Sequence, residues 1–385
     1  MKSTSSLVLA GAIALASFSS NAASVAVDMP RFLAEKETLK QELDAWKRSD
    51  AGQYAKRHGI FVEPKSTQQN ASAVLDDQLR RLHLTKLHIE EAQRANPDAV
   101  FSVDSPFTLM TDAEFAKFIG SSYRQHADAS HVLASFKNTT TATNSSSSSG
   151  SGSSGTETNN LPVAPLADKD WTTSGCVAPV KQQGQCGSCW AFAAIAALES
   201  AYCLQGHELT TFSEQQVLSC DQASHGCEGG FPGDGLQYVQ QQGGVCRDSE
   251  YAYESGQSGD AGQCSASSCS PVQLSIREVK SVPQSDAGLV AAVQQQPVAV
   301  GVAAGNPTWK QYKSGVVSTC ASTQLDHAVV VVGVGGSGSS APFFKIRNSW
   351  GAAWGEQGYI RLKRGVAGAG TCGVIGPKSV VPILS

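Results

Sequence analysis

Two cysteines three positions apart, Cys186 and Cys189, lie in the stretch GQCGSCWAF, and their spacing allows four kinds of chemistry. They could be a redox pair, half of a zinc site, the ends of two separate disulfides, or a nucleophile beside a disulfide. A thioredoxin-like redox pair needs a strand before it, whereas the polar, turn-like segment APVKQQGQ precedes this pair. A zinc site needs a second ligand pair, and Cys220 and Cys227 are too far apart to supply it. Two separate disulfides and a nucleophile beside a disulfide stay open.

The chain that follows Cys189 favours the nucleophile. The run CWAFAAIAALESAYCLQG is apolar on nearly all sides and ends at Gly206, so it predicts a buried central helix with a glycine cap. A thiol in the first turn of a helix lies at the positive end of the helix dipole, which favours the thiolate. A disulfide at Cys186 would hold the preceding loop in place. We therefore predict that Cys189 is a nucleophile.

A thiol nucleophile needs a base, and the C-terminal half of the chain contains three histidines. His207 directly follows the predicted helix, where a solvated surface position is expected, and His225 lies in the loop SHGCEGG. His327 opens the apolar run HAVVVVGVG, which predicts a buried strand that would fix the ring on a rigid element. We therefore predict that His327 is the base.

Two further groups would complete such a site. Asn348 ends the alternating strand FFKIRN, where its amide oxygen could accept a hydrogen bond from the imidazole, and the indole of Trp350 could exclude water from that bond. A turn-forming asparagine is the simpler alternative. For the oxyanion of an acyl-transfer reaction, the backbone N–H of Cys189 and the side-chain amide of Gln183 are candidate donors.

The 385 residues carry a formal net charge of -4, and this length suggests about two domains. The chain has no long Lys/Arg run, so we expect no nucleic-acid partner. Lys2 precedes the apolar stretch LVLAGAIALASF and the small residues SSNAAS, which predicts a signal peptide over residues 1–22. The apolar stretch is shorter than the roughly 20 residues that span a bilayer, so we expect no stable membrane anchoring. The chain should therefore enter the secretory pathway.

Three regions of different composition follow the predicted signal peptide. Residues 23–137 are charged, cysteine-free and helix-like, with leucines at helical spacing ahead of an Asn-Pro stop and a second helix expected from Thr111. Residues 138–160 are a Ser/Thr/Gly tract typical of a flexible linker. Residues 161–385 are rich in glycine, cysteine and aromatic residues, with helical patterns first and strand patterns later, which fits one unit of two lobes.

The cysteines and the glycosylation sequons lie in different parts of the chain. All 11 cysteines lie between Cys176 and Cys372, and an odd number in a secreted chain favours five disulfides and one thiol. Sequons occur in the N-terminal half at Asn70, Asn138 and Asn144. We expect these asparagines to carry glycans because that part of the chain should be exposed.

Around Cys189, His327 and Asn348 the chain resembles the papain family of cysteine peptidases. CGSCW is the local signature of that family, and the following segments occur in the family's order: PVKQQGQCGSCWAF, FSEQQVLSCD, GCEGGFP, QQPVAVGV, LDHAVVVVGVG, IRNSWGAAWGEQGYIRLKRG and CGV. His327 comes 138 residues after Cys189 and Asn348 comes 159 residues after it, against the roughly 130–150 typical of the family. The resemblance covers residues 165–385.

The resemblance implies an α+β fold of two lobes, one helical around the central helix and one β-barrel-like, preceded by a helical propeptide. It implies an endopeptidase that cuts peptide bonds through a thioester, with these roles: Cys189 as nucleophile, His327 as general base and then acid, Asn348 as orienter, Gln183 as oxyanion donor and Trp350 as shield. No metal or cofactor would be needed. The resemblance further implies peptide or protein substrates, a propeptide that acts as intramolecular inhibitor, a monomer, and an extracellular or lysosomal/vacuolar destination.

Disulfides and substrate contacts also follow from the resemblance. It suggests Cys186–Cys227, Cys320–Cys372 and Cys220 with Cys264 or Cys269, and we add Cys176–Cys203 and Cys246 with the remaining cysteine. The specificity pocket, for the second residue before the cut, would be lined by Phe231, Pro232, Gly301, Leu325, Ala328 and Pro377, with Gly229, Gly230 and Trp350 also binding substrate. The pocket residues are uncharged, so an apolar or aromatic side chain should fit and arginine should not. No long insertion follows Cys227 to block the cleft, so we expect internal cuts rather than dipeptide trimming.

The N-terminal region resembles the family's propeptide less closely. The segment MTDAEF matches, and so do Asp77, Arg81, Ala92 and Phe107; departures from the family's pattern occur at Thr85, His88, Ser105 and Leu109. Two other functions remain as alternatives: a non-catalytic protein that keeps the fold for binding, and a thiol–disulfide oxidoreductase. The oxidoreductase predicts a bond between Cys186 and Cys189, so the pattern of disulfides separates these functions.

Overall fold

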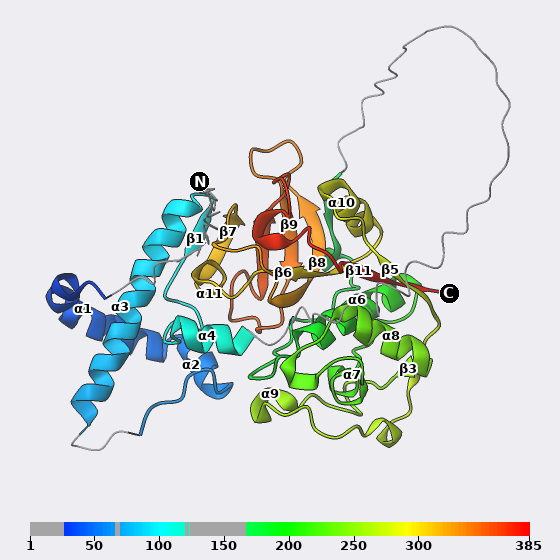
Figure 1. The fold of residues 1–385 in the computed structure, drawn as a ribbon, viewed down its shortest axis with the longest axis horizontal. Coiled ribbons are helices and arrows are strands. Elements are labelled where there is room, and N and C mark those ends of the chain that lie inside the picture. The colour runs from blue at the N-terminus through cyan, green and yellow to red at the C-terminus, as the bar shows by residue number, and fades with distance from the viewer. Residues whose placement is uncertain (1–26, 66–69, 120–122, 124–166) are drawn as a thin grey trace, which may run out of the picture.

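The computed structural model describes residues 27–65, 70–119, 123 and 167–385. These residues form a helical N-terminal unit and a larger C-terminal unit, which lie against each other (Figure 1). The predicted signal peptide, the predicted linker and the sequons at Asn138 and Asn144 lie outside the described residues. Within the part that is described, no helix is both long enough and apolar enough to cross a membrane.

The N-terminal unit consists of α1 (Met29–Arg48), α2 (Asp50–Arg57), α3 (Ala71–Ala95), β1 (Ala99–Phe101) and α4 (Asp112–Ile119). The leucine spacing produces the long helix α3, which buries Leu79 and Leu82 and packs against α1. Helix α4 is the predicted second helix, and Thr111 and Glu114 cap its start, each side chain accepting the other residue's backbone N–H. Figure 1 shows α4 on the side of α3 that faces the C-terminal unit.

One lobe of the C-terminal unit is helical. It contains α6 (Cys189–Leu204), α7 (Glu214–Cys220), α8 (Pro232–Gln242), α9 (Ser255–Ser258) and the short strands β3 (Gly244–Val245) and β4 (Val272–Gln273). Every residue of α6 from Cys189 to Ala201 is buried, as the apolar run predicts for a central helix. The helix ends just before Gly206, whose φ of +93° is a backbone conformation that favours glycine.

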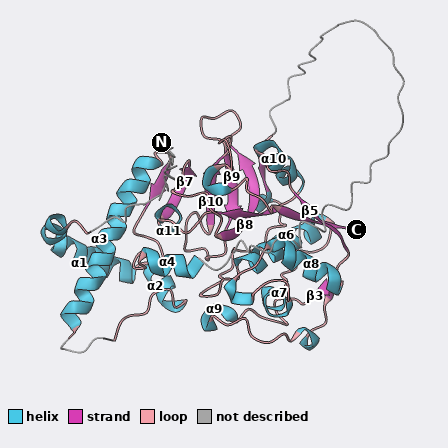
Figure 2. Ribbon diagram, viewed as in Figure 1, coloured by secondary structure: helices cyan, strands magenta, loops and turns pink. Residues whose placement is uncertain are grey.

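The other lobe is built on a nine-stranded sheet, and Figure 2 shows the strands gathered apart from the helices of the first lobe. Its elements after β1 are β2 (Lys169–Asp170), β5 (Ile276–Ser281), α10 (Asp286–Gln295), β6 (Val298–Val302), α11 (Pro307–Lys310), β7 (Tyr312–Val317), β8 (His327–Gly335), β9 (Phe343–Arg347), β10 (Tyr359–Lys363) and β11 (Val380–Leu384). The strand order is β1-β7-β10-β9-β8-β6-β11-β5, with β2 paired to β8. The α+β class and the two lobes are as predicted, and in the described residues the strand lobe is an open sheet rather than a closed barrel.

Strand β8 lies where the two lobes meet. It is buried along its whole length and pairs with β6 on one side and β9 on the other. Helix α6 packs against it. The continuous valine run therefore has a physical reason, because both faces of this strand lie in the core.

The C-terminal unit contains five disulfides, and all 11 cysteines lie in the part of the chain that is described. The pairs are Cys176–Cys203, Cys186–Cys227, Cys220–Cys264, Cys246–Cys269 and Cys320–Cys372. These are the expected pairs, with Cys264 as the partner of Cys220. Cys189 takes part in no disulfide. The bond between Cys186 and Cys189 that an oxidoreductase requires is therefore contradicted.

Candidate active site

Cys189 is the first residue of α6, and its side chain is fully buried. Its Sγ accepts a hydrogen bond from the backbone N–H of Ala328 at 3.2 Å. Because Ala328 directly follows His327, this bond places the thiol beside the first residue of β8. The disulfide between Cys186 and Cys227 ties down the loop just before the helix. The structure thus joins two residues that are 138 positions apart in the sequence.

The imidazole of His327 is oriented by Asn348, with 2.8 Å between Nε2 of the ring and Oδ1 of the amide. An amide oxygen can only accept, so Nε2 carries the proton in this arrangement. Nδ1 is buried and has no hydrogen bond to another described residue, which leaves it able to take the thiol proton. Burial lowers the pKa of His327 to about 4, although the bond to Asn348 acts in the opposite direction. The ring is therefore neutral at pH 7 in this state.

Two indoles contact the imidazole of His327, and a third packs against them. Trp350 stacks on the imidazole with ring centroids 4.8 Å apart, and Trp309 meets it edge-on at 6.3 Å. Trp354 packs edge-on against Trp350 at 5.0 Å, and all three indoles are fully buried. Trp350 thus covers one face of the His327 imidazole. Trp350 has no exposed surface in this state, so it cannot make the expected contact with substrate here.

Gln183 is fully buried, and its amide makes two hydrogen bonds. Nε2 donates to the carbonyl of Cys186 at 3.1 Å, and Oε1 accepts from Oγ of Ser349 at 2.7 Å. The second hydrogen on Nε2 can still serve an oxyanion. Ser349 also donates its backbone N–H to Oδ1 of Asn348 at 2.8 Å, so one serine holds both amides. Sequence analysis missed Ser349 because a serine between an asparagine and a tryptophan belongs to no periodic pattern.

The predicted specificity pocket is filled by Tyr123 of the N-terminal unit. The Tyr123 ring is only 4% exposed and meets the ring of Phe231 edge-on at 4.9 Å. Its hydroxyl donates to the carbonyl oxygen of Pro377 at 3.3 Å. A Cβ on Gly301 would lie 2.7 Å from Cζ of this ring and 3.0 Å from Leu325. Four of the six predicted lining residues thus come together around one side chain, which no sequence motif had marked.

The remaining predicted substrate contacts flank this pocket. Ala328 is paired with Gly301 across β8 and β6, and Pro232 is the buried first residue of α8. Gly229 has a φ of +114°, and a Cβ on Gly230 would lie 2.8 Å from the ring of Trp190. Gly229 therefore allows the turn into Phe231, and Gly230 allows the close approach to Trp190.

The other candidate residues lie elsewhere. His207 follows the far end of α6 from Cys189 and stacks on Tyr202 with centroids 4.0 Å apart, while His225 precedes the turn that carries Cys227. Among the described residues, no cluster of three or more His, Cys, Asp or Glu side chains could hold a metal ion. Asn70 is exposed just before α3.

The geometry can be compared with known proteins. A family model described as papain family cysteine protease matches residues 166–382. The senescence-specific cysteine protease SAG12 of Arabidopsis thaliana is 39% identical over 207 residues, which are 53% of this chain and 59% of that protein. The chain thus matches less than two thirds of the length of that relative.

Longer matches include the N-terminal unit. The cysteine endopeptidase RepA of Oryza sativa subsp. japonica is 33% identical over 331 residues, which are 85% of this chain and 77% of that protein. The crystal structure of the ragweed pollen cysteine protease Amb a 11 in its proform has a TM-score of 0.70 and 30% identity, and the match covers 92% of this chain and 88% of that one. The N-terminal unit thus has counterparts in whole precursors.

Replacing Ser349 by alanine tests whether this serine holds the Gln183 amide. The change leaves the buried Oε1 of Gln183 without its donor, so the free energy of unfolding should fall by about 1–3 kcal/mol. Urea denaturation followed by tryptophan fluorescence measures the change, with Ser270→Ala at an exposed position as control. Equal stability of the two variants would show that Ser349 does not hold Gln183.

Proposed function

The chain belongs to the papain family of cysteine proteases, and we propose that it is the inhibited precursor of a cysteine endopeptidase. One observation supports this activity above the others. The thiol of Cys189 is bonded to the backbone beside His327, and the imidazole of His327 is bonded to the amide of Asn348. The thiol thus lies beside the first residue of β8, and that residue is bonded to its orienter, which supports the roles of nucleophile, base and orienter that thiol catalysis requires.

The reaction begins with movement of the thiol proton of Cys189 to Nδ1 of His327. The thiolate then attacks the carbonyl carbon of the scissile peptide bond and forms a tetrahedral oxyanion. The backbone N–H of Cys189 and Nε2 of Gln183 stabilise this oxyanion by hydrogen bonds. His327 returns its proton to the departing amine, which leaves a thioester on Cys189. Water, deprotonated by His327, hydrolyses the thioester and restores the thiol.

The substrate class follows from the specificity pocket. Phe231, Leu325 and Gly301 present an aromatic ring, an aliphatic side chain and bare backbone to the ring of Tyr123. These walls carry no charge that could pair with an arginine at the second residue before the cut. We propose that the enzyme prefers an apolar or aromatic side chain there and cuts within peptide chains.

Cleavage of a peptide library tests the activity. Full-length chain is processed to the active form, and Cys189→Ala, cut in the linker by an added protease, is the control. We expect cuts at bonds where the second residue before the cut is apolar or aromatic. In the variant, the cleavage rate should fall by at least roughly 10³-fold. A preference for arginine at that position would refute the pocket, and activity retained by Cys189→Ala would refute the nucleophile.

We further propose that the N-terminal unit is the propeptide and inhibits by occupying the site. Besides Tyr123 in the specificity pocket, three phenylalanine rings cover the indole of Trp350 with centroids 5.3, 5.7 and 6.2 Å away, namely Phe107, Phe115 and Phe118. Strand β1 also adds itself to the edge of the catalytic sheet beside β7. The aromatic contacts account for the buried state of the shield that covers the Asn348–His327 bond.

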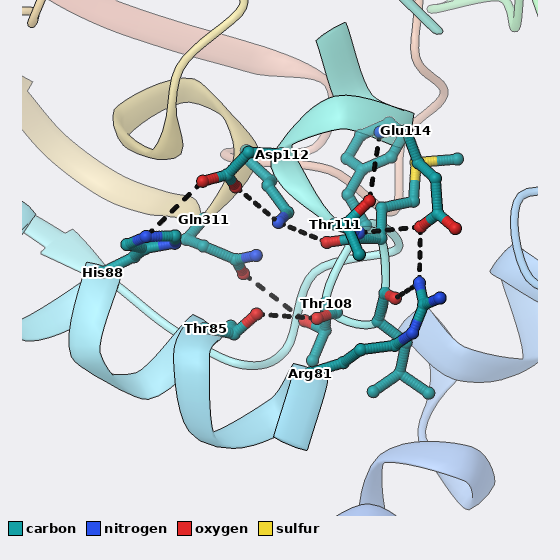
Figure 3. A network of polar contacts seen from close by, with 12 residues as sticks. Arg81, Thr85, His88, Thr108, Thr111, Asp112, Glu114 and Gln311 are labelled. Carbon is teal, nitrogen blue, oxygen red and sulfur yellow. Dashed lines mark hydrogen bonds and ion pairs between the residues drawn. The ribbon is translucent and has the colours of Figure 1, made fainter. Parts of the chain in front are cut away.

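A polar network at the same interface centres on Asp112 of α4. The side chain of Lys310 in α11 is only 2% exposed, and its Nζ contacts the carbonyl of Met110 and lies 3.2 Å from Oδ1 of Asp112. Figure 3 shows Asp112 facing His88 of α3 as well, with 3.5 Å between His88 Nε2 and Asp112 Oδ2. A buried ammonium is costly without a counter-ion, so Asp112 makes this docked position tolerable for Lys310.

Acid should weaken this network. Burial lowers the pKa of His88, as does the nearby Lys310 ammonium, while Asp112 and Glu91 act in the opposite direction. A docked pKa below the ordinary value of about 6.5 means that the released propeptide binds this proton more readily. The contribution of His88 to docking is therefore complete above about pH 6.5 and is lost as the pH falls below that value. Glu114 and Arg81, which also act on Lys310, pair with each other at 2.5 Å (Figure 3).

The rate of processing of the full-length chain tests this network, with each rate divided by the activity of the processed enzyme at the same pH. Asp112→Asn removes the counter-ion of a buried lysine, so processing at pH 7 should be about tenfold faster than in the wild type. Asp104→Asn is the matched control, because Asp104 pairs with Lys313 across the same interface at 2.6 Å but both side chains are exposed. Equal rates for the two variants would contradict the role of Asp112.

The remaining expectations concern the fate of the precursor. We propose that residues 1–22 are removed as a signal peptide, that residues 138–160 link the propeptide 23–137 to the peptidase domain 161–385, and that the product is monomeric. The exposed position of Asn70 supports glycosylation there, and the sequons at Asn138 and Asn144 are proposed on sequence alone. Secretion to the cell exterior or to a lysosome-like or vacuolar compartment follows from the same leader.

A further inference from the structure

The ring of Tyr123 marks where a substrate side chain would lie in the specificity pocket. Three contacts define the fit: the edge-on ring of Phe231 at 4.9 Å, the bare backbone of Gly301, and the carbonyl of Pro377. At Gly301, an added Cβ would lie 2.7 Å from Cζ and 2.8 Å from the hydroxyl oxygen of Tyr123. The pocket therefore fits the full length of a tyrosine, including its hydroxyl.

The hydroxyl of Tyr123 has a partner at the inner end of the pocket. It donates to the carbonyl oxygen of Pro377 at 3.3 Å, while the whole side chain is only 4% exposed. A buried tyrosine hydroxyl without a partner would lose its hydrogen bonds to water, so the carbonyl makes this position favourable. Burial raises the pKa of Tyr123, and the Asp234 carboxylate acts in the same direction. The hydroxyl therefore keeps its proton and remains a donor.

The aromatic wall of the pocket contacts the residue that follows Pro377. Nζ of Lys378 lies 3.1 Å from the centroid of the Phe231 ring, while the Tyr123 ring meets Phe231 edge-on. An ammonium over an aromatic face is attracted by the ring's negative quadrupole. The segment Pro377-Lys378 thus provides both the carbonyl that accepts the hydrogen bond from the hydroxyl and the cation that positions the Phe231 ring.

We propose that the specificity pocket selects tyrosine over phenylalanine at the second residue before the cut, through a hydrogen bond from the tyrosine hydroxyl to the carbonyl of Pro377. This inference rests on the proposed endopeptidase function and refines its apolar or aromatic preference. Lys378 is a positioning residue in this arrangement, because it acts through Phe231. A neutral hydrogen bond of this kind contributes about a three- to tenfold preference.

Four substrates that differ only at this residue provide the test. They carry phenylalanine, tyrosine, 4-aminophenylalanine or O-methyltyrosine, and kcat/KM is measured with enzyme processed from the full-length chain. We expect tyrosine to exceed phenylalanine by about three- to tenfold and 4-aminophenylalanine, which keeps a donor, to exceed phenylalanine as well. O-methyltyrosine keeps the oxygen but cannot donate, so it should be no better than phenylalanine. Equal values for phenylalanine and tyrosine, or for tyrosine and O-methyltyrosine, would overturn the inference.

A variant of the pocket separates failure of this inference from failure of the proposed function. In Gly301→Ala the new methyl group occupies the place of the aromatic ring, so cleavage of substrates with phenylalanine or tyrosine as the second residue before the cut should fall together, while substrates with alanine there are still cut. That result, combined with no preference between the two aromatic residues in the wild type, would overturn the tyrosine selection alone. If Gly301→Ala leaves cleavage of the aromatic substrates unaffected, the ring binds elsewhere; the pocket assignment and the tyrosine selection would then be overturned, while the endopeptidase activity would stand.

Discussion

The proposed chemistry depends on the contact between the first residue of α6 and the first residues of β8. A thiol and an imidazole 138 residues apart can react only if the two rigid elements that carry them begin close together in space. Helix α6 is buried on all sides near its start, and β8 is buried along its length, so neither can shift without disturbing the core. The hydrogen bond from Ala328 to Cys189 fixes the contact, and the disulfide of Cys186 restrains the loop that leads into it.

The residues that sequence analysis identified are those at the ends of strongly patterned elements. Cys189 starts an apolar helix and His327 starts a valine-rich strand, so these continuous apolar runs indicated where their side chains would be held rigidly. Three of the disulfide pairs were implied by the family resemblance and two were added by us. The structure contains all five. The strand lobe, expected to be barrel-like, is an open sheet in the described residues, and its β1 edge is supplied by a segment more than 200 residues from β7.

Tyr123, Ser349 and Lys310 could not be found in the same way. Each owes its role to partners distant in sequence: Tyr123 to Pro377, Ser349 to Gln183, and Lys310 to Asp112. A single tyrosine, serine or lysine has no periodic pattern, and its burial is decided by which segments the fold brings together. The departures from the family's propeptide pattern have a similar explanation. His88 lies beside the Asp112–Lys310 pair and Thr85 donates to the carbonyl of Thr108, so these residues serve local contacts of this chain.

The central claim is that the Cys189 sulfur becomes covalently acylated during turnover. Intact-mass measurement and peptide mapping of processed enzyme, quenched in acid while it hydrolyses an activated ester of an acyl-phenylalanyl-alanine, test it most directly. We predict one added acyl group per molecule, on the peptide that contains Cys189, which disappears after the substrate is exhausted. Turnover without any acyl group on that peptide, or with the group on another residue, would contradict the account.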